Sequence, residues 1–127
     1  MATVPADLGD EQYVLLTTYR RTGIGVPTPV WAARDGDVLV VGTPDHAGKA
    51  KRVRNSPKVT LQACGLTGRP RRGSTAVAGR AERLTGAAAE AALAPLSAKY
   101  GIQFRLAKAV GAFGRPGHVV VLRITAP

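Results

Sequence analysis

Cysteine, histidine and long apolar runs are all scarce in this chain of 127 residues. The single cysteine, Cys64, cannot form a disulfide within the chain, and its apolar neighbours favour a buried, inert thiol. The two histidines, His46 and His118, are far apart and neither has a second ligand type beside it, which argues against a metal site. No apolar run approaches the length of a membrane span, and the N-terminus has no secretory pattern. These absences predict a cytoplasmic protein with no membrane partner.

Acidic residues are also scarce, because 8 of them stand against 18 lysines and arginines, giving a formal net charge of +10. Eight basic residues and no acid fall in one segment: Lys49, Lys51, Arg52, Arg54, Lys58, Arg69, Arg71 and Arg72. Clustered positive charge predicts an anionic partner such as nucleic acid, anionic lipid or a phosphorylated small molecule. Composition does not choose among these three.

The patterns of covalent and acid–base catalysis are missing. There is no Gly-x-Ser-x-Gly motif, and Asp35 and Asp37 belong to a hairpin turn, where aspartate is an ordinary turn former. Tyr100 is a weak candidate for a proton donor, against the more common case of a packed tyrosine. An enzyme with so few reactive side chains would depend on a cofactor for its chemistry.

A single domain over residues 1–127 is expected, with a loose leader at residues 1–9. The chain then alternates between β-rich and helical patterns, and it turns at glycines and prolines. Strands are predicted over 13–20, 26–34, 37–43, 59–65, 74–84 and 118–125, and helices over 44–55, 86–100 (kinked or divided at Pro95) and 102–110. Hairpins dominate this order, so we expect a mainly β fold: six antiparallel strands curled into a small barrel with short flanking helices.

The strongest local signal lies where the third predicted strand ends. Thr43 closes the strand, Gly48 permits a close backbone approach, and Lys49 begins a helix whose free N–H groups suit a phosphate. Lys49 with Arg52, and Lys51 with Arg54, form two basic stripes at helical spacing. A solvated basic helix face is the plainer interpretation, and the residues alone do not exclude it.

Two prolines in the second predicted strand, Pro27 and Pro29, need an explanation. Proline cannot donate to a strand ladder, so these positions must face an unpaired edge, a bulge or something that is not protein.

These elements in order resemble a known family. The motifs are Thr17-Thr-x-Arg-Arg21, Pro27-Thr-Pro-Val-Trp31, the Asp35-Gly-Asp37 hairpin, Gly42-Thr43 and Gly48-Lys-x-Lys-Arg-Val-Arg-Asn-Ser-Pro57. They look like the pyridoxamine-phosphate-oxidase-like split-barrel family, and closest to its short actinobacterial branch that depends on the deazaflavin coenzyme F-420. The resemblance covers about residues 11–125. It implies a six-stranded split barrel that forms a homodimer, with two cofactor sites at the subunit interface.

The resemblance also implies roles for particular residues. The second strand would border the cofactor ring, and the segment after the third strand would hold the phosphate. The ring-bordering residues would be Thr28, Pro29, Val30 and Trp31; the phosphate-holding residues would be Thr43, Gly48 and Lys49. Lys51, Arg52 and Arg54 would contact the phosphate or an acidic tail. Trp31 has an equally ordinary interpretation as a core or interface aromatic.

The expected function is an oxidoreductase that uses the reduced deazaflavin to transfer hydride to an activated C=C or C=N bond of a small organic substrate. The basic segment favours the deazaflavin with its oligoglutamate tail, and FMN is the alternative cofactor. A non-catalytic carrier of either cofactor is a second alternative. Vitamin B6 oxidation is not expected, because the C-terminal residues that bind pyridoxal phosphate in the family's oxidases have no counterpart here. A nucleic-acid partner is not expected either, since aromatics for base stacking are few.

Overall fold

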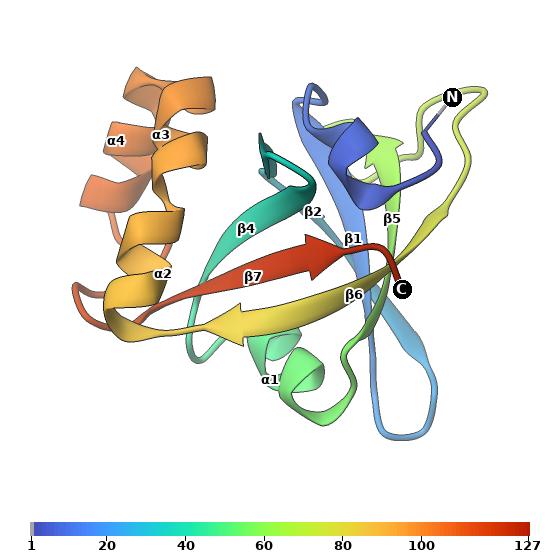
Figure 1. Ribbon diagram of the computed structural model, residues 1–127, viewed down its shortest axis with the longest axis horizontal. Coiled ribbons are helices and arrows are strands. Elements are labelled where there is room, and N and C mark those ends of the chain that lie inside the picture. The colour runs from blue at the N-terminus through green and yellow to red at the C-terminus, as the bar shows by residue number, and fades with distance from the viewer. Residues whose placement is uncertain (1) are drawn as a thin grey trace.

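Seven strands form one antiparallel sheet in the computed structural model, which describes residues 2–127 (Figure 1). The strands are β1 (Tyr13–Tyr19), β2 (Gly25–Val30), β3 (Ala33–Asp35), β4 (Val38–Pro44), β5 (Lys58–Cys64), β6 (Val77–Leu84) and β7 (Val119–Thr125). Their order in the sheet is β2-β1-β5-β6-β7-β4-β3. The predicted class is confirmed as mainly β with a curled antiparallel sheet, although the strands number seven and not six.

The additional strand arises because the predicted strand over 26–34 is divided at Trp31 and Ala32. The Tyr100 hydroxyl accepts from the Ala32 N–H at 3.1 Å, and the Ala32 carbonyl accepts from the side chains of Lys99 and Tyr100. Side chains of a distant helix therefore take the place of a strand partner at this point. The chain crosses there from the edge strand β2 to the edge strand β3, which leaves the barrel split.

The two prolines lie on β2, which is an edge strand paired only with β1. Pro27 lies opposite Thr17 and Pro29 lies opposite Leu15, so both prolines occupy the same alternate row. An edge strand has one row of N–H groups without a ladder partner, and proline is tolerated there. Of the explanations that the sequence left open, the unpaired edge is the one observed.

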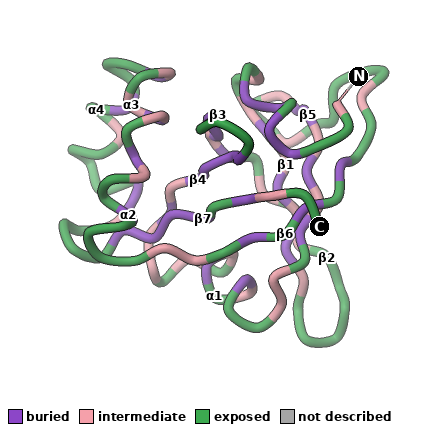
Figure 2. The backbone as a smooth tube through the Cα atoms, in the orientation of Figure 1, coloured by how far each residue is buried: buried purple, intermediate pink, exposed green. Residues whose placement is uncertain are grey.

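Two apolar cores pack on opposite faces of β4 and β7, and Figure 2 shows the buried residues running along the strands. Leu39 and Val41 face the barrel interior, whereas Val38 and Val40 face the helices. This arrangement explains why the sequence is apolar at four successive positions here instead of alternating. The second core holds Tyr100, Phe104 and Phe113 as well.

Helix α1 (Gly48–Asn55) follows β4 at one end of the barrel, and three short helices cover its side (Figure 1). They are α2 (Gly86–Ala92), α3 (Ala94–Tyr100) and α4 (Ile102–Ala109). The division expected at Pro95 is present, with that proline in the first turn of α3. Within residues 2–127, no helix combines the length and the apolar character that crossing a membrane requires.

The expectation of a loose leader is wrong for the part of it that the structure describes. Pro5–Leu8 form a short 3₁₀ helix, η1, and the side chains of Pro5, Ala6 and Leu8 are buried. Leu8 belongs to the barrel core, and η1 packs against β3, β4 and β7. A four-residue segment is too short for its apolar spacing to show a period, so its burial is set by the barrel end that it covers. Met1 lies outside the described residues.

Candidate functional site

A small pocket opens where the end of β2, the middle of β4 and the segment after α4 meet. Its volume is about 200 Å³, and it is lined by Pro29, Val30, Trp31, Gly42, Lys49, Ala107, Ala112 and Phe113. All of these residues except Lys49 are uncharged, so the pocket presents apolar walls with a single cation. Four residues that the sequence nominated, Pro29, Val30, Trp31 and Lys49, are brought together here.

Trp31 is held by aromatic stacking. Its ring lies 4.4 Å from that of Tyr100 with only 7° between the planes, and the ring of Phe113 is tilted against it at 6.4 Å. Stacked and tilted aromatic pairs add to the energy of burial and fix ring orientation. Trp31 is only partly buried, so it is both a packed aromatic and a wall of the pocket.

Tyr100 has the structural role of a packed tyrosine, which argues against its candidacy as a proton donor. Its hydroxyl donates to the carbonyl of Gln12 at 2.9 Å and accepts from the N–H of Ala32. Burial is the main reason that the pKa of Tyr100 is raised to about 12. A hydroxyl held by backbone groups and resistant to ionisation is a tether for Ala32 and, through the stack, for Trp31.

Lys49 supplies the pocket's charge. Burial and the neighbouring Arg52 guanidinium lower the pKa of Lys49 below its ordinary value. No carboxylate of residues 2–127 forms an ion pair with Lys49. Lys49 is also the second residue of α1, whose first N–H groups have no side-chain cap. A partly desolvated ammonium beside free N–H groups is an arrangement that an anion stabilises.

Arg52 and Gly48 lie against each other next to Lys49. The Nε of Arg52 donates to the hydroxyl of the buried Thr18 at 2.6 Å, which anchors α1 to β1. A Cβ on Gly48 would lie 2.6 Å from Nη1 of Arg52, so the glycine leaves room for the guanidinium. Burial, and then the charge of Arg20, lower the pKa of Arg52.

The remaining nominated residues lie outside this pocket. The hydroxyl of Thr43 is fully buried and donates to the Pro44 carbonyl at 3.3 Å. Thr28 lies opposite the core residue Leu16, on the barrel side of β2. Lys51 is exposed on α1, and Arg54 lines a different groove.

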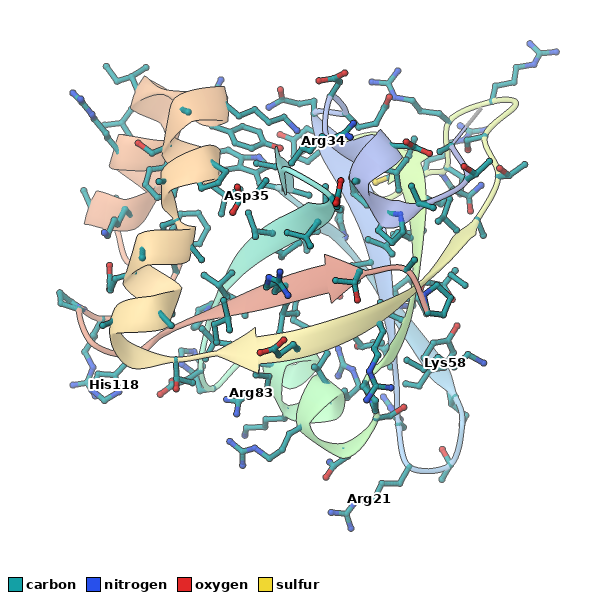
Figure 3. All side chains as sticks on the ribbon, viewed as in Figure 1. Arg21, Arg34, Asp35, Lys58, Arg83 and His118 are labelled. Atoms are coloured by element: carbon teal, nitrogen blue, oxygen red, sulfur yellow. The ribbon has the colours of Figure 1, made fainter. Side chains whose placement is uncertain are left out.

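The basic segment of the sequence separates into two regions because β5 carries the chain along the barrel. Lys49 to Lys58 stay near α1, whereas Arg69 to Arg72 follow the far end of β5. There Arg71 forms an ion pair with Glu11 at 3.0 Å. Arg20 and Arg21 add charge at the α1 end, where Figure 3 shows Arg21 and Lys58. We call this region the basic end: Arg20, Arg21, Lys51, Arg52, Arg54 and Lys58.

Sequence reasoning missed the pocket walls contributed by Gly42 and by the segment around Phe113. A Cβ on Gly42 would lie 3.1 Å from Phe113, so this glycine lets the ring pack closely on β4. A glycine inside an apolar strand was the available signal, since it marks a close approach. Nothing in the local pattern of Ala107, Ala112 and Phe113 indicated a pocket.

Comparison with known proteins places the chain in a family. The model of the pyridoxamine 5'-phosphate oxidase family matches residues 3–126, so the chain belongs to this family. It thereby has the fold of that family's flavin-binding oxidoreductases. No curated protein matches the chain.

Several solved structures share the fold. An F420 reductase has a TM-score of 0.66 at 19% identity, over 95% of this chain and 91% of that one. A pyridoxamine 5'-phosphate oxidase-related, FMN-binding protein from Nostoc punctiforme has a TM-score of 0.59 at 14% identity, over 91% and 70%. The heme storage protein HutZ from Vibrio cholerae has a TM-score of 0.67 at 11% identity, over 93% and 83%. At these identities the likeness concerns the fold.

Proposed function

We propose that this protein is an oxidoreductase that uses reduced coenzyme F-420 to transfer hydride to an activated C=C or C=N bond of a small organic substrate. One observation carries the proposal: Lys49, an ammonium without a carboxylate partner in residues 2–127, lies in the same pocket as Pro29, Val30 and Trp31. An anionic group attached to a flat ring satisfies both parts of that pocket at once.

The residues present fit such a cofactor. Lys49 and the uncapped N–H groups at the start of α1 would hold the phosphate. Pro29, Val30 and Trp31 would border the ring, and Phe113, which packs against Trp31, would extend the same wall. The ring, when bound, supplies the hydride, so the protein contributes orientation and the exclusion of water.

The proton that accompanies the hydride is proposed to come from solvent. The hydroxyl of Tyr100 is committed to backbone groups, and no histidine or carboxylate lines the pocket. Lys49 would stay protonated while it holds an anion, because the anion stabilises the charged ammonium.

The deazaflavin is preferred to FMN because the basic end offers more cations than one phosphate needs. Arg20 and Arg21 lie there with the basic residues of α1, and the acidic tail would bind along them. Exposed pairs contribute about 0–1 kcal/mol each, so only several together would favour the longer anion. The shared fold with an F420 reductase agrees with this choice. An FMN-dependent oxidoreductase is the alternative, and the FMN-binding relative of the same fold supports it.

A homodimer is part of the proposal. The pocket of one chain has a volume of about 200 Å³, below the range of about 300–1,000 Å³ typical of ligand sites. It opens beside the exposed Pro29 on the edge strand β2. A second copy packed over this edge would supply the missing wall and create two cofactor sites at the interface.

Equilibrium dialysis of the purified protein against each cofactor tests the proposal. We expect tighter retention of coenzyme F-420 than of FMN, and reduction of an enone or imine acceptor when the reduced deazaflavin is supplied. Preferential retention of FMN would replace the proposed cofactor. Tight retention of the deazaflavin without turnover of any acceptor would instead indicate a carrier.

A further inference from the structure

A second basic groove lies beside α1 and shares no lining residue with the pocket of Trp31 and Lys49. Its volume is about 430 Å³. The polar residues that line it are Asp45, His46, Arg54, Arg83, Thr85 and His118. Lys49 and Arg54 are five residues apart on α1, so they project from different faces of this helix. The helix therefore separates the two sites.

Arg83 occupies a position in β6 that the strand pattern reserves for the core. Val77, Gly79 and Ala81 form the inward row and are buried, whereas Ala78, Arg80 and Glu82 face outward and are exposed. Arg83 continues the inward row, directly opposite the core residue Leu122 of β7. Figure 3 shows it below β6 on the side where α1 lies.

The Nε of Arg83 is buried and has no hydrogen-bond partner in residues 2–127. A buried donor without an acceptor is destabilising, and for a charged group the penalty is larger. An apolar residue would serve the inward row better if packing were the only requirement. Packing alone does not explain the arginine, whose Nε has no acceptor in the described chain.

The charges around Arg83 specify the sign of that acceptor. Neither Arg54 nor Arg83 forms an ion pair with a carboxylate of the described chain. The one acid in the groove, Asp45, already lies 3.3 Å from His118 and 3.7 Å from His46. Two guanidinium groups remain, and both face a groove large enough for more than a water molecule.

We propose that this groove binds the phosphoryl group of a small molecule, with the guanidinium groups of Arg83 and Arg54 on its oxygens. A planar guanidinium donates two parallel hydrogen bonds to a phosphate, and two of them match a dianion better than a single carboxylate. The imidazoles of His46 and His118 lie at the rim and offer further donors. The inference goes beyond the proposed function and stands without it, because the groove and the cofactor pocket share no lining residue; Arg54 is common to the groove and the basic end, whereas Arg83 belongs to the groove alone.

Calorimetric titration with pyrophosphate tests the proposal, and it is performed in a Lys49→Ala background so that the cofactor pocket does not contribute. Arg83→Gln is compared with Arg80→Gln, which removes the same charge from the outward face of the same strand. We expect Arg83→Gln to weaken pyrophosphate binding at least about tenfold, as loss of charge-assisted hydrogen bonds predicts, and Arg80→Gln to change it by less than about twofold. Arg54→Gln, at an exposed position of α1, should weaken it as well.

Three results would overturn the proposal. Equal weakening by Arg83→Gln and Arg80→Gln would show a diffuse effect of net charge. Equal binding of chloride at matched ionic strength would show that no phosphoryl site exists. A change of oligomeric state in Arg83→Gln without pyrophosphate binding by the parent would show that a second copy supplies the acceptor.

Retention of coenzyme F-420 by Arg83→Gln with Lys49 intact is measured in parallel, so that failure of this site and failure of the cofactor pocket are distinguished.

Discussion

At the scale of single residues, the pocket depends on two side chains that are constrained in different ways. Trp31 is positioned by its stack on Tyr100, whose hydroxyl in turn holds the backbone at Ala32 and at Gln12. Lys49 differs, because burial and the charge of Arg52 both destabilise its ammonium and so lower its pKa. Trp31 therefore forms a fixed wall of the pocket, and the ammonium of Lys49 would be stabilised by a bound anion.

Replacement of Tyr100 by phenylalanine distinguishes a structural role of the Tyr100 hydroxyl from a role as proton donor. The change removes the hydrogen bonds to Gln12 and Ala32, so we expect the free energy of unfolding to fall by about 1–3 kcal/mol. Chemical denaturation measures the loss. The turnover rate per bound cofactor and its pH profile should stay unchanged. A turnover rate reduced by orders of magnitude with only slight destabilisation would restore the tyrosine as proton donor.

The same tyrosine predicts how stability changes in alkali. The pKa of Tyr100 is raised to about 12 in the folded chain, whereas an unfolded tyrosine titrates near about 10. The stabilisation is therefore fully present below about pH 10 and is lost as the pH rises toward about 12. Denaturation of the parent and of Tyr100→Phe across this range measures the difference, because the variant lacks this contribution. Parallel pH curves for the two proteins would contradict the prediction.

At the scale of elements, two short segments complete the barrel: η1, which the sequence pattern leaves undefined, and α1, which the sequence pattern predicts. The 3₁₀ helix η1 covers one end with Leu8, which is 3% exposed. Helix α1 lies at the basic end and is tied to β1 through Arg52 and Thr18. Both segments are fixed by contacts with strands that are distant in sequence.

Leu8→Ala measures the contribution of η1 to the barrel. We expect the free energy of unfolding to fall by about 2–5 kcal/mol, the usual range for a buried leucine. Val4→Ala is the matched control, because Val4 is 40% exposed and should change stability by less than about 0.5 kcal/mol. Chemical denaturation of both variants measures their free energies of unfolding. Similar small effects would mean that the N-terminal segment detaches in solution.

The strands and helices with a clear period could be predicted from the sequence, and the split could not. The alternation in Tyr13–Tyr19 and the double-faced apolar run at Val38–Val41 reflect local requirements of burial. The break at Trp31 and Ala32 depends on hydrogen bonds from Lys99 and Tyr100, which are 67 and 68 residues from Ala32 in the sequence. Local propensity carries no information about such a contact.

The candidate site divides in the same way. Lys49 and the Pro29–Trp31 strand have local signals, a basic helix start and prolines in a strand, and the structure brings them into one pocket. Thr43 has the same kind of signal, but its hydroxyl turns into the core and bonds to the Pro44 carbonyl. Phe113 has no local signal, because it reaches the pocket only through the packing of the helices.

At the scale of the whole molecule, charge is distributed unevenly over the surface. The net charge of +10 is gathered at the basic end and again beyond β5, where Glu11 offsets part of it. The pocket between β2 and β4 opens at an unpaired sheet edge. Both features are consistent with the proposal that a second copy supplies the missing wall of the pocket and that an anionic cofactor binds there.

If a second copy completes the pocket, cofactor binding and dimer formation are thermodynamically linked. We expect the affinity for coenzyme F-420 to fall when the protein is diluted below the dissociation constant of the dimer. Sedimentation across the same dilution series, with and without cofactor, measures the dimer directly and should show that cofactor stabilises it. An affinity independent of dilution, with a monomer throughout, would contradict the proposed interface site.

Trp31 is the only tryptophan in the chain, so its fluorescence reports on the pocket without any label. Titration with coenzyme F-420 should quench Trp31 emission in step with retention of the cofactor in dialysis. Lys49→Ala should need at least about tenfold more cofactor for the same quenching, because a charge-assisted contact is lost. Arg80→Ala, which removes an exposed charge from the outward face of β6 and lies outside the basic end, should match the parent. Cofactor that is retained while Trp31 emission stays constant, or quenching that is indifferent to Lys49, would contradict the account.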